Sequence, residues 1–244
     1  MNSIFLISDF NAEPLARYLL NNNEESMSVE TAPFGQVFQS LAGKENYDGG
    51  IVWTLPEKVI PTFARAIEFS KIDVESCLNE VAVFADAVLD FSMRHQYVFV
   101  ASWVIAADSR GYGILDWRNG LGLKNLLARM NLHLADLLGD ASNVYILDAA
   151  HWSATISQMT SPKMWYAAKV PYSNAVFENA AMDMSAAINT LAGKSRKLII
   201  VDLDNTLWGG VVGETGWQGI RLGGHDFVGE AFCDFQRCLR ALSR

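Results

Sequence analysis

The sequence predicts an α/β fold in which a parallel β-sheet is covered by helices on both faces. Through the first 190 residues, short runs of consecutive apolar residues alternate with segments of helical periodicity. A strand that is buried on both faces is apolar along its whole length, and helices connect such strands. Half of the 244 residues are hydrophobic and 19% are charged, which is enough apolar material for a large core and excludes global disorder.

The expected elements follow in order along the chain. Unbroken apolar runs predict strands at Ser3–Ile7, Gly49–Thr54, within Tyr97–Ala107 and at Asn143–Leu147. Apolar residues at helical spacing predict helices at Glu13–Leu20, Pro61–Phe69, Val74–Phe91, Leu121–Leu138 and Phe177–Leu191. Asn11 and Pro14 suit the start of the first helix, and the polar stretch Asn21–Ser28 predicts a loop. Because functional groups of parallel sheets lie at the carboxyl ends of strands, the residues that follow each strand are candidates for a site.

Charge and hydropathy exclude several classes of protein. The net charge of −8 and the pI near 5.0 argue against a nucleic-acid partner, which would require a basic surface. The longest apolar stretch, residues 97–107, has 11 residues, whereas a membrane span needs about 20. The N-terminus lacks the basic region of a signal peptide. With 3 cysteines and no disulfide framework, we expect a cytoplasmic protein without a membrane span.

The pattern most specific for chemistry follows the apolar run Leu198–Val201, which predicts a further strand. Asp202 and Asp204 come directly after it. Residues i and i+2 at the end of a strand point to the same side, so both carboxylates can face one pocket. One carboxylate can attack phosphorus while the other moves protons. A divalent cation, Mg²⁺ by preference, would neutralise the crowded oxygens, with Asp202 and Asp204 as metal ligands.

The longer string DLDNTLWGGVVGETGWQGIRLG, residues 202–223, closely resembles the first motif and the flap of the haloacid dehalogenase superfamily, in its FkbH-like subgroup (subclass IIIC). The resemblance implies that Asp202 is the nucleophile that forms an aspartyl-phosphate. Asp204 then corresponds to the general acid/base, with its carbonyl also facing Mg²⁺, Thr206 supports the loop, and residues 209–223 form the flap. It further implies a Mg²⁺-dependent phosphatase or phosphotransferase that acts on a small phosphorylated acid. Some members load a glyceryl unit onto an acyl-carrier protein, and others belong to polyketide or polysaccharide biosynthesis.

The family's later motifs are absent from this sequence. They comprise a Ser/Thr that holds the phosphate, a Lys that offsets its charge and an acidic pair that completes the metal site. The sequence ends at Arg244, 42 residues after Asp202, and its last segment, Gly229–Leu242, resembles the first helix after the flap. We therefore expect residues 198–244 to form an incomplete phosphatase domain of Rossmann-like type, with weak or absent Mg²⁺ binding. As written, the chain is not expected to be a competent phosphatase.

The N-terminal residues resemble the domain that precedes the phosphatase in FkbH-like proteins. The matching strings are ISDFN at residues 7–11, FGQVFQ at 34–39 and WYAAKVPYS at 165–173. They imply a three-layer domain over residues 1–190, of the SGNH-hydrolase and flavodoxin-like type, joined by a linker at residues 191–197 to the phosphatase part at 198–244.

A hydrolase site in this domain is one of the alternatives. Ser8, Asp148 and His151 have the order and spacing of a catalytic triad, with Gly35 and either Asn119 or Asn131 as candidate oxyanion donors. The usual Gly-Asp-Ser order is replaced by Ser-Asp-Phe, however. Ser8 could instead cap a turn, and His151 could pack beside Trp152. The functional alternatives are therefore an ester hydrolase or acyltransferase, and a non-catalytic module that docks a carrier protein.

Overall fold

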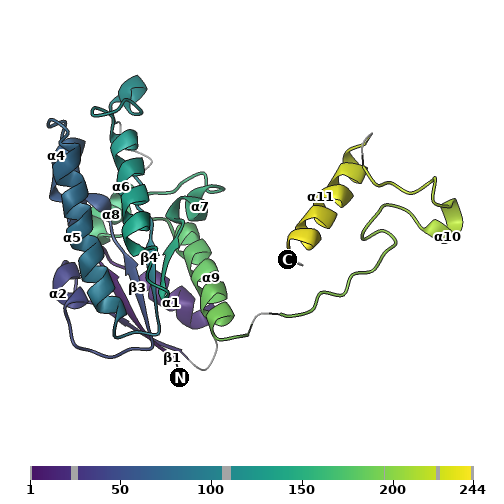
Figure 1. The fold of residues 1–244 in the computed structure, drawn as a ribbon, viewed down its shortest axis with the longest axis horizontal. Helices are drawn as coiled ribbons and strands as arrows, with labels where there is room; N and C mark the ends of the chain where they lie inside the picture. Colours follow the sequence, from purple (N-terminus) through teal and green to yellow (C-terminus); the bar gives the residue numbers. More distant parts are fainter. Residues whose placement is uncertain (1, 23–26, 106–110, 195, 224–225, 243–244) are drawn as a thin grey trace. The chain divides into compact units, whose positions relative to one another are not determined.

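The structure, a computed structural model, describes residues 2–22, 27–105, 111–194, 196–223 and 226–242. The chain divides into two compact units, Met1–Leu191 and Ala192–Arg244 (Figure 1). Each unit is described separately. The middle of the expected polar loop, residues 23–26, and the chain end at Arg244 lie outside the described residues.

Unit 1 is built on a parallel sheet of five strands in the order β2-β1-β3-β4-β5. The strands are β1 (Asn2–Ser8), β2 (Met27–Thr31), β3 (Gly49–Trp53), β4 (Tyr97–Ala101) and β5 (Val144–Leu147). Strand β1 pairs on both sides, so that Leu6 lies opposite Thr31 of β2 and Ile51 of β3. This is the doubly wound, flavodoxin-like order, and the direction of winding reverses between β1 and β3. The predicted fold class is confirmed.

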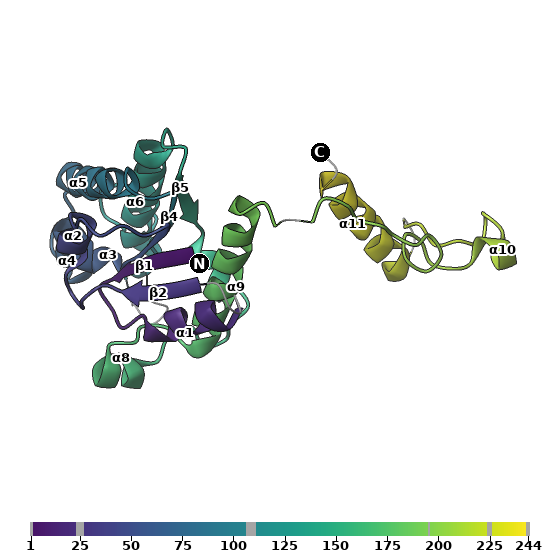
Figure 2. The ribbon, with the colours of Figure 1, turned by 90° about the horizontal axis from the view of Figure 1, so that it is seen from below.

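Helices cover both faces of the sheet (Figure 2). One layer contains α1 (Glu13–Asn22), α7 (Ala149–Ser153) and α9 (Asn174–Leu191), and the other contains α2 (Val37–Leu41), α4 (Pro61–Ile67), α5 (Val74–Ser92) and α6 (Leu123–Leu138). Shorter elements are α3 (Pro56–Val59), α8 (Pro162–Ala168) and the 3₁₀ turn η1 (Gly113–Leu115). Along β1, Ile4 and Leu6 belong to the core under α1 and α9, whereas Phe5 and Ile7 belong to the core under α5 and α6. This two-sided burial is why the strands lack a polar face.

Strand β2 is an element that the sequence pattern did not predict. Its sequence MSVET overlaps the expected loop, and its side chains are only partly buried. As an edge strand it pairs with β1 alone, so it carries polar residues instead of an unbroken apolar run. The sequence pattern also does not predict the short helices α2, α3, α7 and α8, because each has too few residues to show a helical period.

Unit 2 contains two helices, α10 (Val212–Thr215) and α11 (Phe227–Leu242), among the described residues. The strand predicted at Leu198–Val201 is wrong, because these residues are extended but unpaired. The only β contacts described in this unit are isolated bridges, Asp204 with Trp208 and Gly209 with Arg221. A strand forms only where a neighbour accepts its hydrogen bonds. Without one, Leu198 is 73% exposed and Ile200 86%.

None of the described helices has the length and hydropathy that a membrane span requires. The long helices of unit 1 instead follow the amphipathic pattern of the sequence. Helix α5, for example, begins after Asp73, whose side chain accepts a hydrogen bond from the backbone N–H of Ser76 at 3.1 Å. Such an N-cap satisfies a donor that the helix itself leaves unpaired.

Asn131 of α6 fixes the chain where it leaves β4. Its Oδ1 accepts a hydrogen bond from Trp103 N at 2.8 Å, and its Nδ2 donates to Trp103 O at 2.8 Å. Both backbone groups of Trp103 lie beyond the strand, where no ladder partner is available. The Asn131 side chain therefore replaces the missing sheet neighbour at this position.

We predict that Asn131→Ala lowers the free energy of unfolding by about 1–3 kcal/mol, because two partly buried backbone groups lose their partners. Asn125→Ala on the same helix is the matched control, since its side chain only accepts a bond from Arg129 Nε on the surface and its loss should cost less than about 0.5 kcal/mol. Urea unfolding of both variants measures the difference. Equal effects would contradict the assigned role.

Candidate functional site

The Asp-x-Asp motif of unit 2 lies in a loop that is held in shape by its own side chains. Asp204 Oδ1 accepts hydrogen bonds from Trp208 Nε1 at 2.9 Å and from Val212 N at 3.3 Å. Asn205 has a left-handed backbone with φ of 53°, and its Oδ1 accepts a bond from Gly210 N at 2.8 Å. Asparagine tolerates this conformation better than most residues. The side chains of Asp204 and Asn205 thus connect the start of the loop to its later residues, 208–212.

Asp202 lies differently. It is exposed, and its Oδ1 accepts a hydrogen bond from the next backbone N–H, that of Leu203, at 2.8 Å. Within the described part of the chain no partner is recorded for its Oδ2. Thr206 contributes through its backbone, which donates to Leu203 O at 3.3 Å. The two carboxylates of the motif therefore have different environments, one that shapes the loop and one that faces solvent.

The residues expected to form the flap begin as a short antiparallel pairing. Gly209 and Arg221 exchange backbone hydrogen bonds of 3.0 and 2.8 Å. A side chain at position 209 would meet the ring of Phe232, because an added Cβ would lie 2.9 Å from that ring. The requirement for glycine there is steric. Gln236 Nε2 also donates to Leu207 O, so helix α11 supports the loop that carries Asp204.

The motif supplies the kind of ligand atom that Mg²⁺ prefers, but too few such atoms. Asp202 and Asp204 supply hard carboxylate oxygens, which Mg²⁺ prefers. Among the described residues, no group of three or more His, Cys, Asp or Glu side chains is positioned to hold a metal. One oxygen of Asp204 is already occupied by Trp208 and Val212. The two aspartates could therefore hold only part of the octahedral shell that Mg²⁺ requires.

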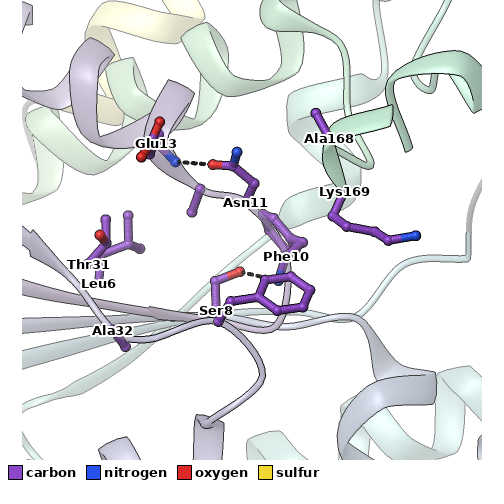
Figure 3. A pocket seen from close by; sticks show the side chains of 11 residues that line it. Leu6, Ser8, Phe10, Asn11, Glu13, Thr31, Ala32, Ala168 and Lys169 are labelled. Atoms are coloured by element: carbon purple, nitrogen blue, oxygen red, sulfur yellow. Dashed lines mark hydrogen bonds between the residues drawn. The ribbon is translucent and has the colours of Figure 1, made fainter. Parts of the chain in front are cut away.

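The three residues of the expected hydrolase triad are placed apart in unit 1. Ser8 is 5% exposed, and its Oγ accepts a hydrogen bond from Phe10 N at 3.1 Å (Figure 3). Asp148 is the N-cap of α7 and accepts from Ala150 N at 3.0 Å. His151 is exposed, and its backbone N–H donates to Asp148 O at 3.1 Å. No hydrogen bond joins any two of the three side chains in the described structure. The triad remains a prediction.

The sheet order explains this separation. Ser8 ends β1 and Asp148 follows β5, with β3 and β4 between them. Adjacent strands are about 4.8 Å apart, so the ends of β1 and β5 are separated by roughly 14 Å. Of the candidate oxyanion donors, Asn131 uses its amide on Trp103. Asn119 is exposed in the loop after η1. Gly35, with φ of 75°, lines the cavity that also contains Asp9, the neighbour of Ser8. Its role as an oxyanion donor stays a prediction.

Phe10 occupies the third position of the Ser-Asp-Phe sequence, where a Gly-Asp-Ser enzyme would have its nucleophile. The ring is 3% exposed and packs edge-on against Trp53 and Tyr172, with Phe177 beside them. Edge-to-face packing of this kind is favourable for aromatic rings. This position of the domain therefore supplies an apolar floor and no nucleophile.

Asp9 is a buried acid that the sequence analysis did not single out. Its two carboxylate oxygens accept hydrogen bonds from Leu55 N at 3.2 and 3.0 Å, which ties the end of β1 to the end of β3. Burial raises the pKa of this carboxyl from 3.8 to about 7, and Glu57 adds to the increase, while the Leu55 N–H and Lys58 oppose it. The signal available was its place after an apolar strand at the switch point.

Three neighbouring cavities lie along the carboxyl edge of the sheet. Their volumes are about 370, 380 and 450 Å³, within the range of ligand sites. The first is lined by Ser8, Phe10 and Lys169 (Figure 3). The third is lined by Asp9, Gly35 and Lys58 and shares Phe34 and Lys169 with the first. Asp148 and His151 line none of the three. The concave part of unit 1 is thus at the ends of β1 and β3.

Comparison with solved structures supports the fold. The N-terminal part of the protein BF1531 from Bacteroides fragilis, which contains a phosphatase domain and is complexed with Mg, is 20% identical with a TM-score of 0.82 over 99% of this chain. This chain covers 65% of the length of that neighbour. The lipase Lip_vut3 from a goat rumen metagenome is 10% identical, with a TM-score of 0.50, over 77% of this chain and 97% of its own.

An acetylxylan esterase from Geobacillus stearothermophilus, solved as a catalytic mutant, is 10% identical over 79% of this chain and 94% of its own, with a TM-score of 0.49. No family model matches the sequence, and no curated protein matches it. At these identities the likeness concerns the fold. The chain is an α/β protein with a five-stranded parallel sheet flanked by helices.

We predict that stability falls as the pH rises from about 4 to 7, through Asp9. The folded chain holds this proton up to a pKa of about 7 and the unfolded chain only to 3.8. The stabilisation is therefore complete below 3.8 and is lost as the pH passes through 7, by at most about 1.4 kcal/mol per pH unit. Asp9→Asn keeps an acceptor for Leu55 N and removes this dependence.

Urea unfolding at pH 5 and pH 8 measures the effect. The advantage of Asp9→Asn over the wild type should be larger at pH 8 than at pH 5. Asp90→Asn, at an exposed position of α5, is the control and should change stability equally at both values. Parallel pH profiles for the wild type and Asp9→Asn would contradict the assigned pKa.

Proposed function

We propose that Asp202 and Asp204 are the nucleophile and the general acid/base of Mg²⁺-dependent phosphoryl transfer from a small phosphorylated acid. The observation that carries the proposal is their unequal environment. Asp204 is oriented by Trp208 and Val212, whereas Asp202 is exposed. A reaction that needs one positioned proton carrier and one accessible nucleophile uses this difference. The solved neighbour that contains a phosphatase domain with Mg supports the proposal at the level of the fold.

The chemistry follows from the two carboxylates. A carboxylate oxygen of Asp202 attacks phosphorus, an aspartyl-phosphate forms, and the bond from phosphorus to the leaving oxygen breaks. Asp204 gives its proton to that oxygen and then takes one from the water or other acceptor that cleaves the aspartyl-phosphate. Bound Mg²⁺ would offset the negative charge of the phosphate oxygens. Its remaining ligands would have to come from groups other than these two aspartates.

The wider biochemical role is part of the same proposal. The resemblance to FkbH-like proteins suggests that a glyceryl or other acyl unit is loaded onto an acyl-carrier protein as phosphate leaves. Loading from an acyl phosphate breaks a different bond: a carrier thiol attacks the carbonyl carbon, a thioester forms and phosphate leaves, whereas attack of Asp202 on phosphorus releases the free acid. The two would be alternative reactions of the same substrate. The resemblance also favours a cytoplasmic setting in polyketide or polysaccharide biosynthesis.

For unit 1 we propose a binding role in place of ester hydrolysis. The favouring observation is Phe10, which fills the nucleophile position and is packed into an aromatic cluster. An ester hydrolase or acyltransferase using Ser8, Asp148 and His151 would need their side chains to approach one another across the sheet edge. In the described structure each is engaged elsewhere or exposed.

Covalent labelling tests the nucleophile alone, because the sequence as given lacks the later motifs and is not expected to be a competent phosphatase. With acetyl phosphate and Mg²⁺, followed by borohydride reduction, we expect the wild-type chain to carry one modified aspartate at position 202, located by peptide mass spectrometry. Asp202→Asn should abolish the label. Asp204→Asn keeps acceptors for Trp208 and Val212, so it should still be labelled, but hydrolysis of its label should slow by about 10²-fold or more.

Asp234→Asn is the matched control, because this exposed residue only pairs with Arg237 on helix α11. It should be labelled as the wild type is. Label that persists in Asp202→Asn, or an unlabelled wild-type chain under conditions that label a known aspartate phosphatase, would sink the proposal. Ester cleavage that disappears in Ser8→Ala with an unchanged fold would revive the hydrolase alternative.

A further inference from the structure

Two lysines from distant parts of unit 1 converge on one tryptophan at the carboxyl edge of the sheet. Lys58 Nζ lies 5.9 Å from the centre of the Trp165 ring, and Lys169 Nζ lies 5.1 Å from it. Lys58 belongs to α3, which follows β3, whereas Trp165 belongs to α8 and Lys169 ends that helix. The fold, and not proximity in sequence, brings Lys58 to the other two residues.

Neither ammonium group forms a salt bridge with a described residue, although the charge of Lys58 acts on the nearby carboxyls of Asp9 and Glu57 and lowers the pKa of both. The ring face of a tryptophan attracts a cation, but it does not neutralise the charge. Two ammonium groups beside the same ring repel each other. Both lysines line the cavity of about 450 Å³, so an anion bound in that cavity would offset the charge of both and would be open to charge-assisted hydrogen bonds from them.

Hydrogen bonds fix the backbone at both lysines. Lys169 has a left-handed conformation, with φ of 54°, which is unusual for a residue with a side chain. Its N–H donates to Trp165 O at 3.0 Å, and its carbonyl accepts from Asn11 N at 2.9 Å. The N–H of Lys58 donates to Leu55 O at 3.0 Å. A strained residue held in place by its neighbours is a common feature of binding sites.

The cavity of about 450 Å³ is lined by all three residues, Lys58, Trp165 and Lys169. Lys58 and Trp165 line both the cavity of about 450 Å³ and the cavity of about 380 Å³. Apolar side chains contribute to each, Phe34 and Phe38 to the first and Val104 and Tyr166 to the second. The carboxyl edge between β1 and β3 is the topological switch point, where doubly wound sheets bind their ligands.

We propose that this cleft, defined by Lys58, Trp165 and Lys169, binds an organic phosphate monoester whose body is apolar or aromatic. A phosphate dianion matches two separate ammonium groups better than a carboxylate does, because lysine acts as a point charge, whereas a planar carboxylate is better matched by arginine. The adjoining apolar walls provide space and contact area for the organic part.

Two acids also face this region and do not oppose the assignment. Asp9 lines the larger cavity and Glu57 the smaller one. Burial raises the pKa of both carboxyls, that of Asp9 to about 7. Asp9 is in addition engaged by Leu55 N. In the cavity of about 450 Å³ the two lysines face one acid, Asp9, whereas Glu57 lines the smaller cavity.

This binding site is separate from the proposed phosphoryl-transfer chemistry, because all of its residues belong to unit 1. The probe is phenyl phosphate, titrated by calorimetry at pH 7 in the presence of EDTA, so that no metal-dependent reaction occurs. Three further compounds are compared with it. Inorganic phosphate lacks the apolar body, benzoate carries a carboxylate in place of the phosphate, and benzyl alcohol carries no charge. We expect phenyl phosphate to bind more tightly than inorganic phosphate and benzoate, and benzyl alcohol not to bind detectably.

Variants locate the site. Lys58→Met and Lys169→Met keep the apolar stems and should each weaken phenyl phosphate binding by about tenfold or more, through the loss of one charge-assisted contact. Trp165→Leu should weaken binding of phenyl phosphate while leaving the weaker binding of inorganic phosphate little changed. Lys163→Met on helix α8 is the matched control, because Lys163 is exposed and lines none of the three cavities. It should bind as the wild type does.

Asp202→Asn separates this inference from the proposed function, since it should leave phenyl phosphate binding unchanged. Binding that is lost in Asp202→Asn but kept in both lysine variants would place the ligand in unit 2 and overturn the inference. Equal weakening in Lys163→Met would show a general effect of surface charge and would also overturn it. Failure of the wild type to bind phenyl phosphate at millimolar concentration, with the fold verified by circular dichroism, would do the same.

Discussion

The pairing of β1 with β2 on one side and β3 on the other is the contact on which the rest of unit 1 depends. It satisfies the backbone hydrogen bonds along both edges of β1, whose two faces are covered by the helix layers. It also places the point where the winding direction reverses beside Ser8 and Asp9. The hydrogen bonds from Leu55 N to the Asp9 carboxylate extend this pairing one step beyond the strands. The cavities therefore open at the ends of β1 and β3, next to this link.

The same edge of the sheet carries the residues that follow β1 and β5. Phe10 turns the nucleophile position into part of an aromatic floor with Trp53 and Tyr172. Asp148 caps α7, and Ser8 closes a turn. Burial removes water from the floor, while Lys58 and Lys169 bring charge to its rim.

Unit 2 shows what happens to an apolar segment that has no strand to pair with. Leu198–Val201 has the apolar composition of a buried strand, but the described part of the unit offers it no partner, and its side chains are exposed. The loop that follows is nevertheless shaped, because its order comes from short-range bonds of Asp204 and Asn205 and from the support of α11. Local hydrogen bonding can form the motif loop without a sheet, whereas the strand needs one.

By itself the sequence determined the α/β class, four of the five strands and the long helices, because continuous apolar runs and helical periods are local signals of burial. It also located the Asp-x-Asp loop, whose shape comes from neighbouring residues. Tertiary structure alone decided the edge strand β2, the pairing state of Leu198–Val201, the separation of Ser8 from Asp148 and the convergence of Lys58 with Trp165 and Lys169. These features join residues far apart in the chain, and no local pattern specifies which distant segment will supply the partner.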